Sequence, residues 1–238
     1  MRKSFKPGAL TAPLPPVMVT VGDDKEYNVI TIGWTGILST IPPKTYISVR
    51  PERHSFSLLK RNGEFVINLT RASQARIVDY VGIYTGAKVD KFKECSLTPT
   101  KSEKVLPPTI KECPVALECK VCEVIPMGTH HVFVADIVSV SCDEQIIDEK
   151  GKIRFDNAGL LAYAHGEYYA LGEKLGSFGF STKKEEKVAP CVKKTGKKHT
   201  VNTKKDEKEE KKNPFYLTAP RGKVRTQKRK NSKGGKGR

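Results

Sequence analysis

The chain has 238 residues, of which 37% are apolar and 29% charged, and its formal net charge is +17. Residues 183–238 hold 21 Lys or Arg and 6 Asp or Glu, so residues 1–182 carry only +2. No run of 18 apolar residues and no apolar signal-peptide core are present, which argues against a membrane span and favours a cytoplasmic protein. We therefore expect one domain over residues 1–182, with a single core, and a disordered basic tail over residues 183–238.

Hydrophobic alternation predicts that most of the domain is β-structure. Runs rich in β-branched residues predict strands over residues 17–22, 28–34, 45–50 and 64–69. Two longer runs, 113–128 and 130–148, predict adjacent antiparallel strands with a hairpin loop at Pro126, Met127 and Gly128. Many strands with few helices indicate a β-barrel.

Two short helices are predicted between the strands. Residues 55–62 have Ser55 as a candidate N-cap, and Gly63 follows the last turn. Residues 73–82 have apolar side chains spaced for one helical face. The stretch 158–180, rich in Gly and Tyr, is interpreted as a surface segment that docks onto another part of a structure.

The cysteines allow a metal or redox hypothesis, since Cys119 and Cys122 form a CxxC motif. An extended strand sends residues i and i+3 to opposite faces, however. The adjacent pair His130 and His131 does not suit chelation on one strand face, and no second CxxC motif is present. We therefore predict buried, reduced thiols and no metal site.

Six segments, taken in order, carry a family resemblance. NVITIGWTG, ISVRPERHS, GEFVINLT, VDKF, CPVALEC and HGEYYALGEKLGSFGFS resemble the flavin reductase-like FMN-binding split-barrel family, and within it the flavoredoxin-type branch. The match covers residues 8–182. It implies a mainly β fold, namely a six-stranded antiparallel Greek-key split barrel with short flanking helices. It also implies a homodimer that binds FMN near the subunit interface.

A cluster at the start of the first predicted helix suits a phosphate group. Arg50, Arg53, His54 and Ser55 stand there, and phosphate prefers guanidinium groups and the free N–H groups of a helix start. Taken alone, these residues slightly favour an exposed arginine pair beside an ordinary N-cap. The resemblance implies instead that they bind the phosphate or the nearby ribityl chain of FMN.

The same region supplies candidates for the flavin ring. The resemblance implies that the ring and ribityl chain lie against Thr31, Trp34, Thr35 and Gly36. Gly36 would allow close backbone approach. Trp34 either stacks beside the ring or anchors a core or dimer contact, and we weigh the two equally. Asn28 and Ser48 either hydrogen-bond the cofactor or satisfy strand ends.

The remaining candidates come from later segments: Asn68, Thr70, Arg71, Lys91, His165 and Tyr168. Asn68 to Arg71 end a predicted strand, and a cation there or at Lys91 would stabilise negative charge on reduced flavin. Most lysines are simply solvated, which is the alternative for Lys91. The resemblance implies that His165 and Tyr168 lie near the flavin pocket of the same or the partner subunit, although a histidine in such a place is more often structural.

Three functions follow from these observations. The first is an oxidoreductase that passes electrons from NAD(P)H through bound FMN to a flavin, small molecule or protein. The second is a flavoredoxin-like carrier fed by a redox protein. The third is a polyanion-binding protein that acts through weak contacts of its basic tail. No catalytic side chain is assigned, because the flavin itself performs hydride chemistry. Without a GxGxxG loop, a nicotinamide has to stack directly on the flavin.

Overall fold

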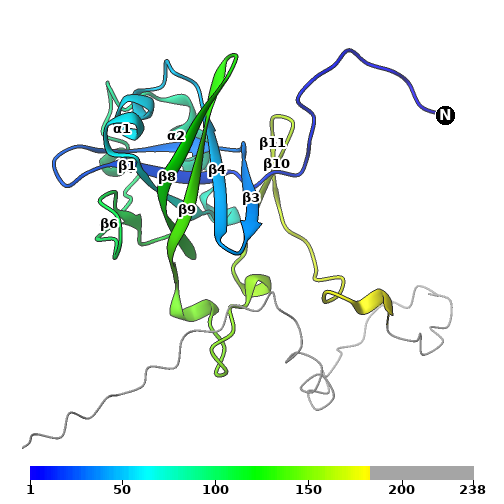
Figure 1. Cartoon of the computed structure of the whole chain (residues 1–238). Helices are drawn as coiled ribbons and strands as arrows, with labels where there is room; N and C mark the ends of the chain where they lie inside the picture. Colours follow the sequence, from blue (N-terminus) through cyan, green and yellow to red (C-terminus); the bar gives the residue numbers. More distant parts are fainter. Residues whose placement is uncertain (183–238) are drawn as a thin grey trace, which may run out of the picture.

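The computed structural model describes residues 1–182, and the predictions for the tail fall on residues 183–238, outside the described residues. The described chain is mainly β, as predicted (Figure 1). Its main sheet is antiparallel, with the strand order β2-β1-β5-β8-β9-β4-β3. These strands are β1 (Val17–Gly22), β2 (Tyr27–Ile32), β3 (Thr35–Thr40), β4 (Pro43–Val49), β5 (Glu64–Leu69), β8 (Val115–Met127) and β9 (His130–Cys142).

The main sheet has seven strands where six were predicted, and β3 is the additional one. The strand predicted over 28–34 ends at Ile32, and β3 begins only two residues later. β3 is an edge strand whose Ile37 and Leu38 are both more than half exposed. Its side chains therefore lack the inward–outward alternation from which a strand is predicted.

The connection from β2 to β3 forces the sheet to curl. These two strands lie at opposite ends of the sheet order, although only Gly33 and Trp34 separate them in the chain. β2 also contacts β4, and the Trp34 carbonyl accepts a hydrogen bond from the Ser48 amide at 3.0 Å. No ladder joins β2 to β3 within residues 1–182. The chain thus connects the β2 and β3 edges of the barrel, but no strand pairing joins these two edges within residues 1–182.

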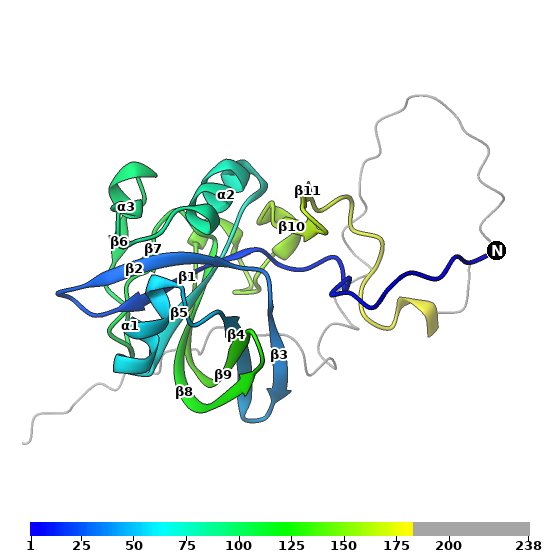
Figure 2. The ribbon, with the colours of Figure 1, turned by 90° about the horizontal axis from the view of Figure 1, so that it is seen from above.

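The barrel interior is apolar. It contains Val17, Val19 and Val21 of β1, together with Ile47, Phe65 and Phe133 from the other strands. Leu58 and Leu59 of α1 (His54–Asn62) pack into the same cluster, so this helix covers one part of the barrel (Figure 2). The helix ends at Gly63 with φ 65°, as predicted. Its N-cap is Arg53, so the prediction of Ser55 was wrong.

A second apolar cluster lies on the other face of β1. Met18 packs there with Val78 and Val81 of α2 (Ala75–Ile83) and with Phe92 of α3 (Lys91–Glu94). The predicted helical face of residues 73–82 is therefore confirmed, although the 3₁₀ turn η1 (Ala72–Gln74) forms its first residues. β1 is consequently buried along its whole length, between the barrel interior and the helices.

The remaining elements are short. β6 (Pro99–Thr100) pairs with β7 (Thr109–Ile110), and β10 (Leu161–Ala164) pairs with β11 (Glu167–Ala170). The 3₁₀ turns are η2 (Glu144–Ile146), η3 (Phe155–Asn157) and η4 (Phe180–Thr182). The β8–β9 hairpin is confirmed, but β9 ends at Cys142, before η2. No helix within residues 1–182 is long and apolar enough to cross a membrane.

Two glycines with positive φ allow a matched test of the β1–β2 hairpin. A Cβ at Gly22 (φ 104°) would overlap the Glu26 carbonyl and lie 2.7 Å from Tyr27 Cα, whereas none of the described atoms is within 4 Å of that position at Gly128 (φ 60°). We expect Gly128→Ala to lower the free energy of unfolding by about 1 kcal/mol through backbone strain. Gly22→Ala should cost at least about 2 kcal/mol more, because the hairpin must shift. Urea denaturation measures both, and equal losses would contradict the steric argument.

Candidate functional site

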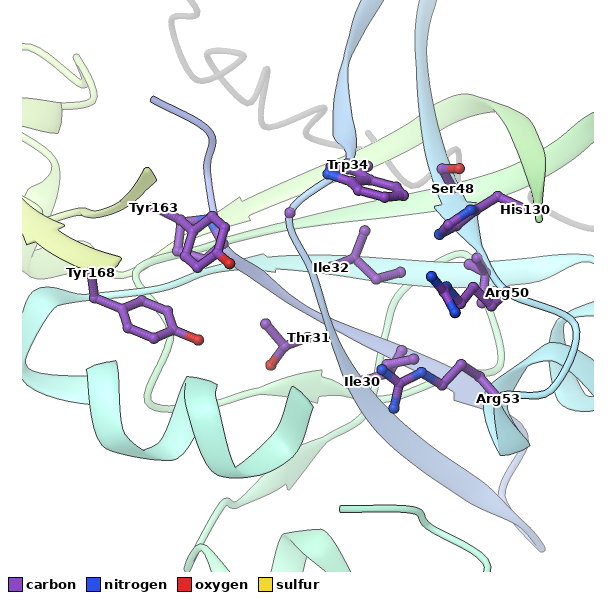
Figure 3. A pocket seen from close by; sticks show the side chains of 13 residues that line it. Ile30, Thr31, Ile32, Trp34, Ser48, Arg50, Arg53, His130, Tyr163 and Tyr168 are labelled. Carbon is purple, nitrogen blue, oxygen red and sulfur yellow. The ribbon is translucent and has the colours of Figure 1, made fainter. Parts of the chain in front are cut away.

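A cavity of about 290 Å³ lies where the two edges of the barrel approach each other. β2 and the turn after it supply one wall, and the end of β4 supplies another (Figure 3). Its lining is formed by Pro16, Ile30, Thr31, Ile32, Gly33, Trp34, Ser48, Val49, Arg50, Arg53, His130, Tyr163 and Tyr168. None of these residues is acidic, and two are arginines. The cavity therefore favours an anionic ligand with apolar or aromatic parts.

The two arginines lie together at one end of the cavity, at the start of α1 (Figure 3). Arg53 Nη1 donates to the Gly82 carbonyl oxygen at 3.1 Å, and this carbonyl lies in the last turn of α2. Arg50 Nη1 lies 3.3 Å from Glu52 Oε1 in an exposed pair. The α1 N-cap makes no side-chain hydrogen bond. Guanidinium donors beside an uncapped helix start suit a phosphate group.

Aromatic side chains form the rest of the wall. The Trp34 and His130 rings have centroids 4.4 Å apart and planes tilted by 52°. Trp34 is 42% exposed, so a large part of the indole faces outward from the core. On the opposite side, the Tyr163 and Tyr168 rings meet edge to face at 5.3 Å. A flat aromatic ligand would find complementary surfaces on both sides.

The polar groups of this wall are held by specific partners. Tyr168 donates to Asp79 Oδ1 at 3.2 Å. Burial, together with the Asp79 carboxylate, raises the pKa of Tyr168 to about 12, so its hydroxyl is neutral at physiological pH. Thr31 Oγ1 donates to the Val78 carbonyl oxygen at 2.6 Å, and its oxygen can still accept a hydrogen bond from a ligand.

The flavin reductase-like domain model matches residues 10–172, which is more than half of the chain. The chain belongs to the flavin reductase-like family. This membership and the antiparallel split barrel confirm the family and fold predicted from the sequence. They support a flavin-related redox function for the protein.

Two solved structures and one further relative align with most of the described domain. Flavoredoxin of Desulfovibrio vulgaris is 31% identical, with a TM-score of 0.72, over 77% of this chain and 100% of that one. An FMN-binding protein of Thermus thermophilus is 27% identical, with a TM-score of 0.63, over 74% and 99%. An uncharacterized protein of Archaeoglobus fulgidus is 34% identical over 60% of this chain and 80% of its own length.

Six of the site residues predicted from the sequence line the cavity: Thr31, Trp34, Ser48, Arg50, Arg53 and Tyr168. The other ten do not reach the lining, and most are bonded within the protein. Asn28 Nδ2 donates to Ser55 Oγ at 2.9 Å, and both side chains are buried. His54, half-buried, lies 3.9 Å from a Glu26 carboxylate oxygen. Their assignment as cofactor contacts stays a prediction.

The predicted residues of β3 and β5 also have structural partners. Thr35 Oγ1 donates to the Tyr46 carbonyl at 2.6 Å, and Gly36 packs against the Tyr46 ring. Asn68, fully buried, donates to the Met18 carbonyl and accepts from the Ile110 amide. These bonds join β3 to β4 and β5 to its neighbours, so they shape the barrel that surrounds the cavity.

Three more predicted residues fix the segments around the cavity. Thr70 Oγ1 donates to the Pro16 carbonyl at 2.6 Å. Arg71 pairs with Asp143 at 2.8 Å and donates to the Ala158 carbonyl at 3.0 Å. His165 is exposed, in the turn between β10 and β11, and has φ 47°. That hairpin presents Tyr163 and Tyr168 to the cavity, whereas His165 is not part of the lining.

Lys91 is buried, with only 4% of its surface exposed. Its Nζ donates to the Val29 carbonyl at 2.9 Å and to the Val81 carbonyl at 2.7 Å. Burial, and secondly the positive charge of Arg53, lower the pKa of Lys91 to about 8. This lysine ties β2 to the last turn of α2, whose carbonyl end favours a cation.

The sequence analysis missed His130 and Tyr163, which both line the cavity. His130 was considered only as a metal ligand; the pairing of β9 with β4 brings it to the cavity, because the next residue, His131, is opposite Val49. Tyr163 enters the site because its backbone pairs with Leu14 of the N-terminal segment. Neither long-range pairing leaves a signal in the local sequence pattern.

The CxxC prediction is confirmed in part. Cys119 is buried and Cys122 is exposed, so the two thiols do not share a face, and only the first is buried as predicted. Burial raises the pKa of the Cys113 and Cys119 thiols to about 12. Within residues 1–182 no group of His, Cys, Asp and Glu could hold a metal ion.

The buried lysine makes stability depend on pH. Folded Lys91 loses its proton near pH 8, whereas an unfolded lysine holds it to about pH 10.4, so between these values a rise in pH favours the folded state. We expect the unfolding free energy of the wild type, relative to Lys91→Met, to rise by on the order of 2 kcal/mol from pH 7 to pH 10. Urea denaturation at both pH values measures this difference. Lys93→Met, at an exposed position of the same helix, should show no such change; a constant difference for Lys91→Met would contradict the assignment.

Proposed function

We propose that the protein binds FMN in the cavity and passes electrons through it from NAD(P)H to an acceptor. The observation that carries this proposal is the division of the cavity into two chemical ends. Two guanidinium groups and a helix start lie at one end, and the rings of Tyr163 and Tyr168 lie at the other, with no acidic residue in the lining. FMN has the same division between a phosphate dianion and a flat ring.

FMN fits this arrangement with its phosphate at Arg50 and Arg53. The ring would then lie over Ile30 and Ile32, between the Trp34–His130 pair and the two tyrosines. FMN is preferred to FAD because FMN ends in a single phosphate group. The two arginines at one end of the cavity can donate hydrogen bonds to such a group. The relatives named above include an FMN-binding protein of Thermus thermophilus, which supports this choice.

In this proposal the protein binds, orients and shields, and bound flavin supplies the hydride and electron chemistry. Arg50 and Arg53 hold the anionic end. Thr31 Oγ offers an acceptor to a ring N–H group, and the neutral Tyr168 adds no charge to the aromatic end. Trp34 and His130 keep water from one side of the cavity. A second substrate would approach through the open part of the cavity.

Removal of either arginine tests the phosphate site. We expect Arg50→Ala and Arg53→Ala each to weaken FMN binding about tenfold or more, because a charge-assisted hydrogen bond contributes about 1.5–3 kcal/mol. Riboflavin, which lacks the phosphate, should be affected much less. Arg61→Ala is the matched control, since Arg61 lies in the last turn of α1, outside the cavity lining, and pairs with Asp23 and Glu26 on the surface. Fluorescence titration measures the affinities, and equal losses for both ligands would contradict this orientation.

The electron donor distinguishes a reductase from a carrier. We expect the flavin absorption of the FMN-loaded protein to bleach when NADH or NADPH is added without oxygen. Similarity to flavoredoxin favours the second candidate, a carrier reduced by another protein. Bleaching by dithionite alone would support that carrier and contradict nicotinamide use. Failure to bind FMN at all would contradict both flavin functions.

A homodimer is the proposed assembly. Apolar side chains are exposed on three strands of one half of the sheet, β3, β8 and β9, among them Ile37, Leu38, Val124 and Val138. Burial of such a surface against a second copy would stabilise the assembly. Sedimentation equilibrium should give twice the mass of one chain at micromolar concentration. The mass of a single chain, with FMN present, would contradict the dimer.

A further inference from the structure

His130 is the one imidazole in the lining of the cavity, and its surroundings give it a specific role. It is the first residue of β9, and its ring lies between Trp34 and Arg50 in Figure 3. We infer that His130 is a ligand-binding residue that takes up a proton when a phosphate-bearing ligand binds beside Arg50. This inference rests on the proposed function and adds a proton-linked residue to the site.

The contacts of His130 permit both of its charge states. Thr129 Oγ1 lies 2.8 Å from His130 Nδ1, and a hydroxyl can donate to a neutral imidazole or accept from a protonated one. The indole of Trp34, with its centroid 4.4 Å away, offers a π-face that stabilises a nearby cation. Protonation therefore needs no rearrangement of these neighbours.

Without a ligand, the surroundings oppose the charged form. Partial burial, and then the positive charge of Arg50, lower the pKa of His130, while Glu52 acts in the opposite direction and more weakly. Arg53 also lines the cavity and adds positive charge, and the adjacent His131 packs against Phe56 outside it. The ligand-free site therefore has a largely neutral His130 near pH 7.

A bound phosphate reverses this balance. Its negative charge would offset the charge of Arg50 and attract the imidazolium, so the pKa of His130 would be higher in the complex than in the free protein. Because binding and protonation are linked, a lower pH should then strengthen binding through His130. The same argument predicts no such linkage for a ligand without a phosphate.

The test is FMN affinity measured by fluorescence titration from pH 8.5 to pH 5.5, for wild type, His130→Gln and His130→Phe. His130→Phe keeps a ring against Trp34 but cannot take up a proton. The affinity ratio of wild type to either variant should increase about three- to tenfold as the pH falls, since a shift of one pKa unit is tenfold in affinity. Titration of the phosphate of free FMN is the same for all three proteins and cancels in the ratio.

Two controls identify the source of any change. His131→Gln, at the neighbouring position outside the cavity, should follow the wild type at every pH. With riboflavin as the probe, the ratio of wild type to His130→Gln should not change with pH. A constant ratio with FMN, or the same change with riboflavin or in His131→Gln, would overturn the role of His130 alone. Absence of FMN binding by the wild type would overturn the proposed function and this inference with it.

Discussion

The fold depends on one short connection, the two residues Gly33 and Trp34 between β2 and β3. These strands occupy opposite edges of a seven-stranded sheet, so two residues can join them only if the sheet curls until its edges meet. Curling encloses the apolar interior and leaves the β2 and β3 edges without a ladder between them, with the end of β4 across the gap from β2. The cavity lies in this gap, and for that reason its lining combines residues from the strand edges with the loops that follow them.

Several polar residues that suggest a binding site from the sequence hold the walls of this gap instead. Asn68 joins β5 to β1 and to β7. Asn28 of β2 donates a hydrogen bond to Ser55, the second residue of α1. Buried polar groups must be paired, and the partners of these two side chains are protein atoms. They therefore need no ligand to satisfy their hydrogen bonds. The Asn28 bond joins β2, which carries Thr31, to the start of α1, where Arg53 is the N-cap, although Asn28 has no place in the cavity lining.

Local charge in the cavity is independent of the net charge of the chain. The first 182 residues are nearly neutral, yet the cavity lining has two arginines, a histidine and no carboxylate. Acidic partners are present just outside, where Glu52 pairs with Arg50. A site of this kind attracts an anion at short range, because charges in a partly buried cavity are less screened than charges on the surface. Burial first, and this positive charge second, lower the pKa values of His130 and Lys91.

The sequence by itself determined the family, the β-rich class, the helix over residues 54–62 to within one residue, and the pairing of the two long strands. These features follow from local patterns: alternation, a glycine after a helix, and a hairpin turn. Arg50, Arg53, Thr31 and Trp34 were found because they lie within one continuous stretch of chain. Only the tertiary structure decided that Asn68, Thr70 and Arg71 are bonded inside the protein, because their partners are more than 40 residues away in the chain. It also decided that His130 and Tyr163 join the cavity, since β9 reaches β4 and β10 reaches the N-terminal segment through long-range pairings.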